Sequence, residues 1–163
     1  MKPTHLTRLA LLTAVALTMF VVEQQLPPLA PIPGIKLGLA NAVTLYVLRT
    51  GRVRDAALVL AARIILGNLV CGTVAAMLYA AGGGLCAFAG MALLRRAVLQ
   101  TWVLGGPGAL GHSLGQMAVA VAITATPALL AWLPVMLLAS MAAGAFTGLC
   151  VTALLRRLKT LKQ

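Results

Sequence analysis

The chain has 163 residues, of which 61% are hydrophobic and 9% are charged. A soluble domain usually carries about 25% charged residues, so these proportions exclude a soluble domain and predict a membrane protein in the lipid bilayer. The formal net charge is +11, but the basic residues stand at the ends of apolar segments and do not gather into one face. That placement argues against a nucleic-acid partner. The length predicts a single transmembrane domain over residues 1–163.

The apolar pattern predicts an all-α bundle of about six transmembrane helices. A helix needs about 20 apolar residues to cross a bilayer. The predicted spans cover residues 9–26, 35–48, 56–80, 85–94, 109–126 and 133–155, with soft boundaries. The second and fourth are short, so each would be tilted, extended by its flanks or only partly crossing. The first run is long and lacks an A-x-A cleavage site, so we expect a retained span and not a signal peptide.

Basic residues mark alternate ends of these spans, as cytoplasmic loops require. With the N-terminus inside, the outer loops near residues 27–33, 82–84 and 127–134 contain no Lys or Arg. The pattern predicts a multi-pass protein with both termini in the cytoplasm. The inner segments hold 11 of the 13 basic residues, namely Lys2, Arg8, Arg49, Arg52, Arg54, Arg95, Arg96, Arg156, Arg157, Lys159 and Lys162.

Three charged residues do not belong to those inner segments, namely Glu23, Lys36 and Arg63. Glu23 lies about 22 Å along its helix from Arg8, near the outer surface. Lys36 enters the second span from the same side, so the two either pair at similar depth or both snorkel to the interface. Arg63 lies about 12 Å into the third span from Asp55. We expect it to face the bundle interior, held by carbonyls, polar side chains or an anionic ligand group.

Neutral polar residues form two groups inside the apolar segments. Asn41 stands with Thr44 and Tyr46 on the second span. His112 and Gln116 stand on the fifth span, four residues apart, and therefore share a helix face. These groups predict either a narrow polar pocket or interhelical hydrogen bonds.

Glycines beside the second group favour close packing of that helix. Gly111 and Gly115 are four residues apart, as are Gly144 and Gly148 in the last span, and such spacing lets helix backbones approach. The segment from Pro31 to Gly34 ends the first helix in a stiff turn. With Lys36 under it, this turn suits either the mouth of a ligand site or a tight helical hairpin.

The motifs of catalytic sites are missing from the sequence. His112 has no second His, Cys or carboxylate nearby to form a metal site, and the three cysteines form no CxxC. There is no P-loop, no GxGxxG, no Ser–His–Asp set and no paired-carboxylate site. We therefore expect no enzymatic activity, no cofactor and no metal.

One string identifies a related family. PGIKLGLAN at 33–41, with Glu23 upstream, Arg63, the GGGL turn at 82–85 and GHSLGQ at 111–116, resembles the Gx transporter family, labelled heptaprenyl diphosphate synthase component I. The pieces match in order and spacing over about residues 20–125. The family is similar to the S components of energy-coupling-factor transporters, which are six-helix proteins of the bacterial cytoplasmic (inner) membrane that hold a small solute near the outer face.

The resemblance implies a binding site and two kinds of partner. The ligand site would be lined by Glu23, Lys36, Asn41, Arg63, His112 and Gln116. Ala10 and Ala14 on the first helix would dock a transmembrane coupling subunit with its ATPases.

The synthase label implies the alternative partner. Prenyl-chain elongation needs aspartate-rich motifs that hold magnesium on a diphosphate, and this chain has a single aspartate, Asp55. The chain would then be a non-catalytic accessory of the catalytic subunit of a heptaprenyl or polyprenyl diphosphate synthase in isoprenoid quinone biosynthesis, or of a membrane redox system.

Overall fold

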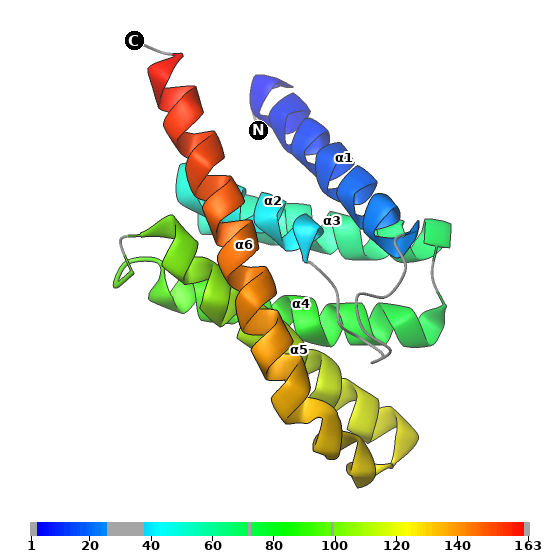
Figure 1. The fold of residues 1–163 in the computed structure, drawn as a ribbon. Helices are drawn as coiled ribbons and strands as arrows, with labels where there is room; N and C mark the ends of the chain where they lie inside the picture. The colour runs from blue at the N-terminus through cyan, green and yellow to red at the C-terminus, as the bar shows by residue number, and fades with distance from the viewer. Residues whose placement is uncertain (1–2, 26–37, 72, 99, 162–163) are drawn as a thin grey trace.

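The computed structural model describes residues 3–25, 38–71, 73–98 and 100–161, and Lys36 lies outside them. Those residues form six α-helices, one short 3-10 helix and no strands, which confirms the predicted all-α class (Figure 1). The elements are α1 (Pro3–Gln25), α2 (Leu39–Thr50), α3 (Val53–Cys71), α4 (Val74–Leu94), α5 (Thr101–Thr124), η1 (Pro127–Trp132) and α6 (Leu133–Thr160).

The helices present an apolar outer surface. Three helical stretches are long and apolar enough to cross a membrane: Pro3–Gln25, Val74–Leu94 and Pro127–Thr160. Leu69, Leu93 and Leu138 are each at least 70% exposed. Lipid, unlike water, covers such side chains without penalty, so the surface agrees with a membrane protein. The six predicted crossings and their orientation stay predictions.

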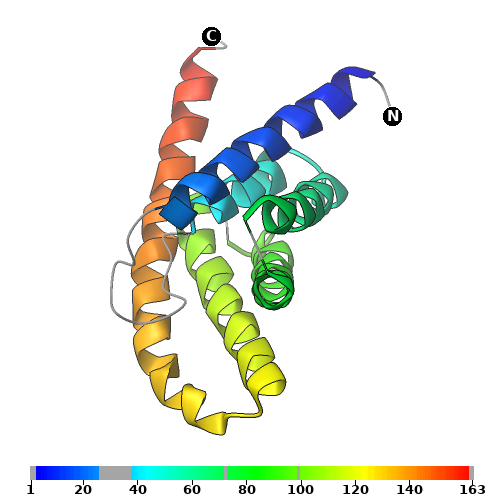
Figure 2. The same ribbon diagram turned by 90° about the vertical axis from the view of Figure 1, so that its right-hand side faces the viewer.

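The helix ends gather at two opposite ends of the molecule. The start of α1, the end of α6 and the ends that face the α2–α3 and α4–α5 connections lie toward the upper left of Figure 1. The end of α1, the facing ends of α3 and α4 and the α5–α6 turn lie toward the lower right. Figure 2 shows the two termini at the end opposite the α5–α6 turn. We call the first end the basic end, because Arg49, Arg95 and Arg156 lie near it.

The boundary predicted between the third and fourth spans is wrong. The sequence placed an outer turn at residues 82–84, but Gly82, Gly83 and Gly84 lie within α4. Instead, α3 ends at Cys71 and α4 begins at Val74. Thr73 caps α4 there, because its hydroxyl accepts a 3.2 Å hydrogen bond from the Ala76 N–H.

The start of the fifth span is also corrected. α5 begins at Thr101 and continues through Pro107, whereas the sequence placed its start at about residue 109. Gly105, in the added first turns, is used for packing. A Cβ built on Gly105 would clash with the backbone of Gly144 and Gly148 on α6, so α5 and α6 are in backbone contact at that level.

Close backbone contacts at glycines also join α4 to α5, as the spacing of Gly111 and Gly115 predicted. A Cβ on Gly111 would lie 2.7 Å from the carbonyl oxygen of Cys86, and one on Gly115 would lie 2.8 Å from the Cys86 sulfur. The Gly144-xxx-Gly148 pattern likewise faces Gly105 and Trp102 on α5. Close contacts of this kind make α4, α5 and α6 one tightly packed wall.

Polar contacts fasten the basic end. Arg49 of α2 donates hydrogen bonds to the carbonyl oxygens of Arg95, at 3.1 Å, and Val98, at 2.6 Å. The ring of His5 on α1 lies 3.2 Å from the carboxylate of Asp55 on α3. Arg49 therefore ties α2 to the α4–α5 connection, and His5 ties α1 to α3.

Candidate functional site

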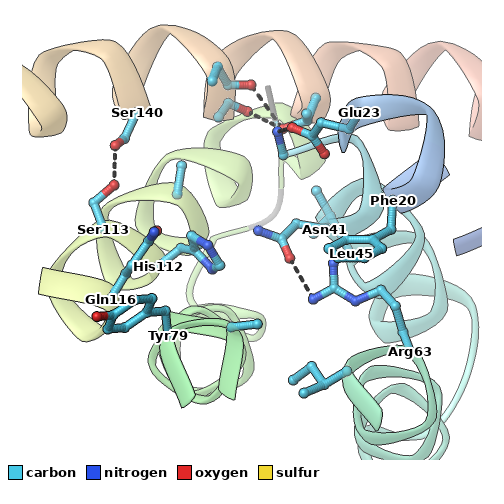
Figure 3. A pocket seen from close by; sticks show the side chains of 18 of the residues that line it. Phe20, Glu23, Asn41, Leu45, Arg63, Tyr79, His112, Ser113, Gln116 and Ser140 are labelled. Carbon is cyan, nitrogen blue, oxygen red and sulfur yellow. Dashed lines mark hydrogen bonds between the residues drawn. The ribbon is translucent and has the colours of Figure 1, made fainter. Parts of the chain in front are cut away.

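A cavity of about 160 Å³ lies between helices α1–α3 and helices α4–α6. Figure 3 shows polar side chains from both groups of helices turned toward it. Its apolar lining includes Phe20, Leu45 and Ile64. Its polar lining consists of Glu23, Gln24, Asn41, Arg63, Asn68, Tyr79, His112, Ser113, Gln116, Ser140 and Thr147. Five of the six predicted ligand residues therefore line one cavity, and the sixth, Lys36, lies outside the described residues.

Arg63 is the buried cation of this cavity. Its side chain is 7% exposed, so it faces the interior as predicted and does not snorkel. One Nη2 hydrogen bond runs to Asn41 Oδ1 at 3.3 Å, and it is the guanidinium's only hydrogen bond to the described residues. A guanidinium carries five N–H donors. Most of that donor capacity is therefore not used in hydrogen bonds to the described part of the chain.

Space for Arg63 comes from the neighbouring helices. Gly84 of α4 faces it, and a Cβ on Gly84 would lie 3.9 Å from Arg63 Nη2. The ring of Phe20 on α1 lies beside the guanidinium in Figure 3. No carboxylate of the described chain forms a salt bridge with Arg63.

Glu23 stands in the last turn of α1 and holds the start of α2. Its Oε1 accepts a 2.5 Å hydrogen bond from the Gly38 N–H. Gly38 has a φ of +72°. This left-handed conformation is strained for residues that carry a side chain, and glycine adopts it freely. This backbone conformation explains the glycine at the centre of the KLGLAN string. The predicted pairing of Glu23 with Lys36 stays a prediction, because Lys36 lies outside the described residues.

Asn41 orients the cation. It lies in the first turn of α2, where its backbone N–H bonds the Gly38 carbonyl at 2.9 Å. Its side-chain oxygen accepts the Arg63 hydrogen bond (Figure 3). Asn41 therefore links the start of α2, which Glu23 holds, to the guanidinium of Arg63 on α3.

His112 and Gln116 line the cavity from α5, on the shared face that their spacing predicted. Ser113, between them in the sequence, makes the interhelical hydrogen bond that was the alternative prediction for this segment. Its hydroxyl bonds that of Ser140 on α6, and Ser140 also bonds the Met136 carbonyl oxygen at 2.5 Å. The GHSLGQ segment therefore supplies both a helix–helix hydrogen bond and side chains for the cavity.

Some lining residues were not identified from the sequence. Tyr79 of α4 was missed because the predicted turn at 82–84 cut α4 in two. Read as one helix, Tyr79 and Gly83 are four residues apart and share the face that meets His112. Ser140 gave no signal, because a lone serine in an apolar helix is common. Asn68 lines the cavity but bonds the Ile64 carbonyl within its own helix, at 2.7 Å.

The remaining predicted residues lie elsewhere. Ala10 and Ala14 are exposed on α1, away from the cavity, and their docking role stays a prediction. Among the described residues no group of three His, Cys, Asp or Glu side chains is arranged to hold a metal ion.

A family model, described as heptaprenyl diphosphate synthase component I, matches residues 12–154. No curated protein and no solved structure matches the chain, so the similarity to S components stays a prediction. The match confirms the resemblance in the PGIKLGLAN string and the residues around it, and the family's description as one component of a synthase agrees with a chain that is not itself an enzyme. The chain belongs to the heptaprenyl diphosphate synthase component I family.

Proposed function

We propose that this protein is a membrane-embedded subunit that binds a small polar or anionic solute in the cavity between α1–α3 and α4–α6. The observation that carries the proposal is Arg63. It is 7% exposed, borders the cavity and makes one hydrogen bond to the described residues. A guanidinium fork matches the geometry of carboxylate and phosphate groups, so an anionic group of a solute would complete its hydrogen bonds.

Energetics favour a ligand over a purely structural role for this cation. A charge in an apolar segment is costly, and a structural charge there usually pairs with an opposite charge or with backbone carbonyls. Arg63 has neither a salt bridge nor a hydrogen bond to a backbone carbonyl within the described residues. Replacing buried ionic groups by apolar side chains of similar volume is often neutral or stabilising. The arginine at this position is therefore best explained by binding.

The position of the cavity supports uptake from the outer face. Glu23 at the end of α1, Gly38 before α2 and Ala76 near the start of α4 all line it. These positions lie toward the end of the molecule opposite the basic end. The positive-inside rule assigns the basic end to the cytoplasm of a bacterial inner membrane.

Transport would need a partner that supplies energy. The sequence contains no nucleotide-binding motif, so a coupling subunit with ATPases would provide it. The exposed Ala10 and Ala14 on α1 offer a small-residue face for docking such a subunit.

The test is purification from native membranes in mild detergent, followed by mass spectrometry of bound small molecules and proteins. We expect a stoichiometric metabolite with the wild type and none with Arg63→Ala. Arg96→Ala is the matched control, because Arg96 is exposed at the basic end. The same metabolite in both variants, or none in the wild type, would show that the cavity is not a solute site.

The family match favours a second candidate function. The chain would be a non-catalytic membrane accessory of a prenyl diphosphate synthase, as the family description suggests. The pathway served would then be isoprenoid quinone biosynthesis; a membrane redox system is the other partner to be tested. In that case a prenyl synthase or redox subunit should co-purify without a metabolite. A deletion strain should lose quinone while solute uptake stays normal, and Arg63→Ala should restore quinone as well as the wild type does.

A further inference from the structure

Two opposite charges border the cavity without touching. Arg63 and Glu23 lie near enough for a favourable Coulomb interaction. No Glu23 oxygen lies within the 4.0 Å of an Arg63 nitrogen that defines a salt bridge. Each charge is fixed by another partner, Arg63 by Asn41 and Glu23 by the Gly38 N–H.

Each charge also keeps hydrogen-bonding capacity for a ligand. Within the described chain, Arg63 uses one of its five donors, and Oε2 of Glu23 accepts no hydrogen bond. Both side chains line the same cavity (Figure 3). In a poorly solvated site, each unused charged group favours a partner of opposite sign.

This pair of charges discriminates between ligand classes. An anion would satisfy Arg63 but would bring a second negative charge beside Glu23. A cation would satisfy Glu23 and meet the opposite conflict at Arg63. A molecule that carries both charges would satisfy Arg63 and Glu23 at the same time.

We propose that the solute is a small zwitterion, with a carboxylate bound by Arg63 and a protonated amine bound by Glu23. This inference rests on the proposed solute-binding function and deepens it. A cavity of about 160 Å³ is similar to the roughly 150 Å³ engineered cavity that accepts benzene, so the ligand is a compact molecule of that order. Phe20 and Leu45 supply apolar contacts for its body.

The test uses a homologous series of ω-amino acids, from glycine to 6-aminohexanoate, and the full chain purified in mild detergent. Each is compared with the n-alkyl carboxylate and the n-alkylamine of the same length, by thermal shift and calorimetry. We expect one chain length of amino acid to bind at least about tenfold more tightly than its matched carboxylate and amine.

Variants test which residue binds the carboxylate and which binds the amine of the solute. Glu23→Gln should abolish the preference for the amino acid over the carboxylate. Arg63→Gln should weaken both. Arg96→Ala is the control, because Arg96 is exposed and does not line the cavity, and it should leave the preference unchanged. Loss of the preference in Arg96→Ala, or its persistence in Glu23→Gln, would overturn the assignment.

The remaining outcomes separate this inference from the proposed function. Equal binding of carboxylates and amino acids, unaffected by Glu23→Gln, makes the site an anion site and overturns the zwitterion only. If no probe binds, the Arg63-dependent metabolite from native membranes decides by its charges: a zwitterion supports the inference, and any other species overturns it. If there is neither a bound probe nor such a metabolite, both proposals fail.

Discussion

Gly83 of α4 lies directly against the imidazole of His112 on α5. A Cβ built on Gly83 would be 2.8 Å from both Cε1 and Nδ1 of that ring and 2.9 Å from the His112 carbonyl oxygen. Contacts this short do not occur with a real side chain. The absence of a side chain at residue 83 therefore lets α4 and α5 meet at this level with His112 on the wall of the cavity.

Gly83→Ala should displace both the ring and the α5 backbone. We expect a loss of about 1–3 kcal/mol in the free energy of unfolding, as for overpacking elsewhere, together with weaker solute binding. Gly106→Ala is the matched control, because nothing lies within 4 Å of a Cβ there and alanine favours the helix by up to about 1 kcal/mol. Thermal unfolding in detergent measures both variants, and equal midpoints would contradict the packing argument.

Arg63→Met separates binding from stability. Replacing a buried charge by an apolar side chain of similar volume is often neutral or stabilising, by about 1–4 kcal/mol. We expect Arg63→Met without solute to unfold at the same temperature as the wild type or higher, while solute binding is lost. A clear fall in the unfolding temperature of the solute-free variant would indicate a structural role for Arg63.

Arg63→Lys keeps the charge and loses the planar fork. Charge-assisted hydrogen bonds contribute about 1.5–3 kcal/mol, so we expect binding on the order of 10- to 100-fold weaker. Calorimetry with the metabolite recovered from native membranes gives the change. Unaltered affinity would mean that a point charge alone is recognised.

Arg49→Ala should loosen the basic end. The mutation leaves the carbonyl oxygens of Arg95 and Val98 without this donor, and we expect a loss of about 1–3 kcal/mol. Limited proteolysis of inside-out membrane vesicles should then cut near residues 95–100 faster than in the wild type. Arg54→Ala is the control, since Arg54 is exposed. Similar cleavage in both variants would show that the Arg49 contacts do not hold the connection.

The crossing of α5 and its orientation are tested by labelling single cysteines in a background without Cys71, Cys86 and Cys150. A cysteine at Ala131 in η1 should react with a membrane-impermeant maleimide added to intact cells. A cysteine at Arg96 should react only after permeabilisation. The reverse pattern would invert the topology, and reaction of both from outside would change the number of spans.

The sequence predicted the cavity better than the helix boundaries. Glu23, Asn41, Arg63, His112 and Gln116 are polar groups in apolar helices, and burial in protein is the usual solution for such groups in a membrane. Their convergence in one cavity is consistent with that rule.

Glycines caused the error at residues 82–84. A glycine run permits a turn and equally permits close helix packing, and the choice depends on what faces it. At Gly83 and Gly105 the facing elements are α5 and α6, and only the folded structure brings them there. The sequence alone could not decide between a turn and a contact.

Helix α2 connects the cavity to the basic end. Asn41 in its first turn borders the cavity, and Arg49 near its last turn holds the α4–α5 connection. The two residues are eight positions apart, about 12 Å along one uninterrupted helix. One helix therefore carries both a residue that lines the cavity and the residue that holds the basic end, so under the proposed solute binding a displacement of α2 at Asn41 would also reach the Arg49 contacts.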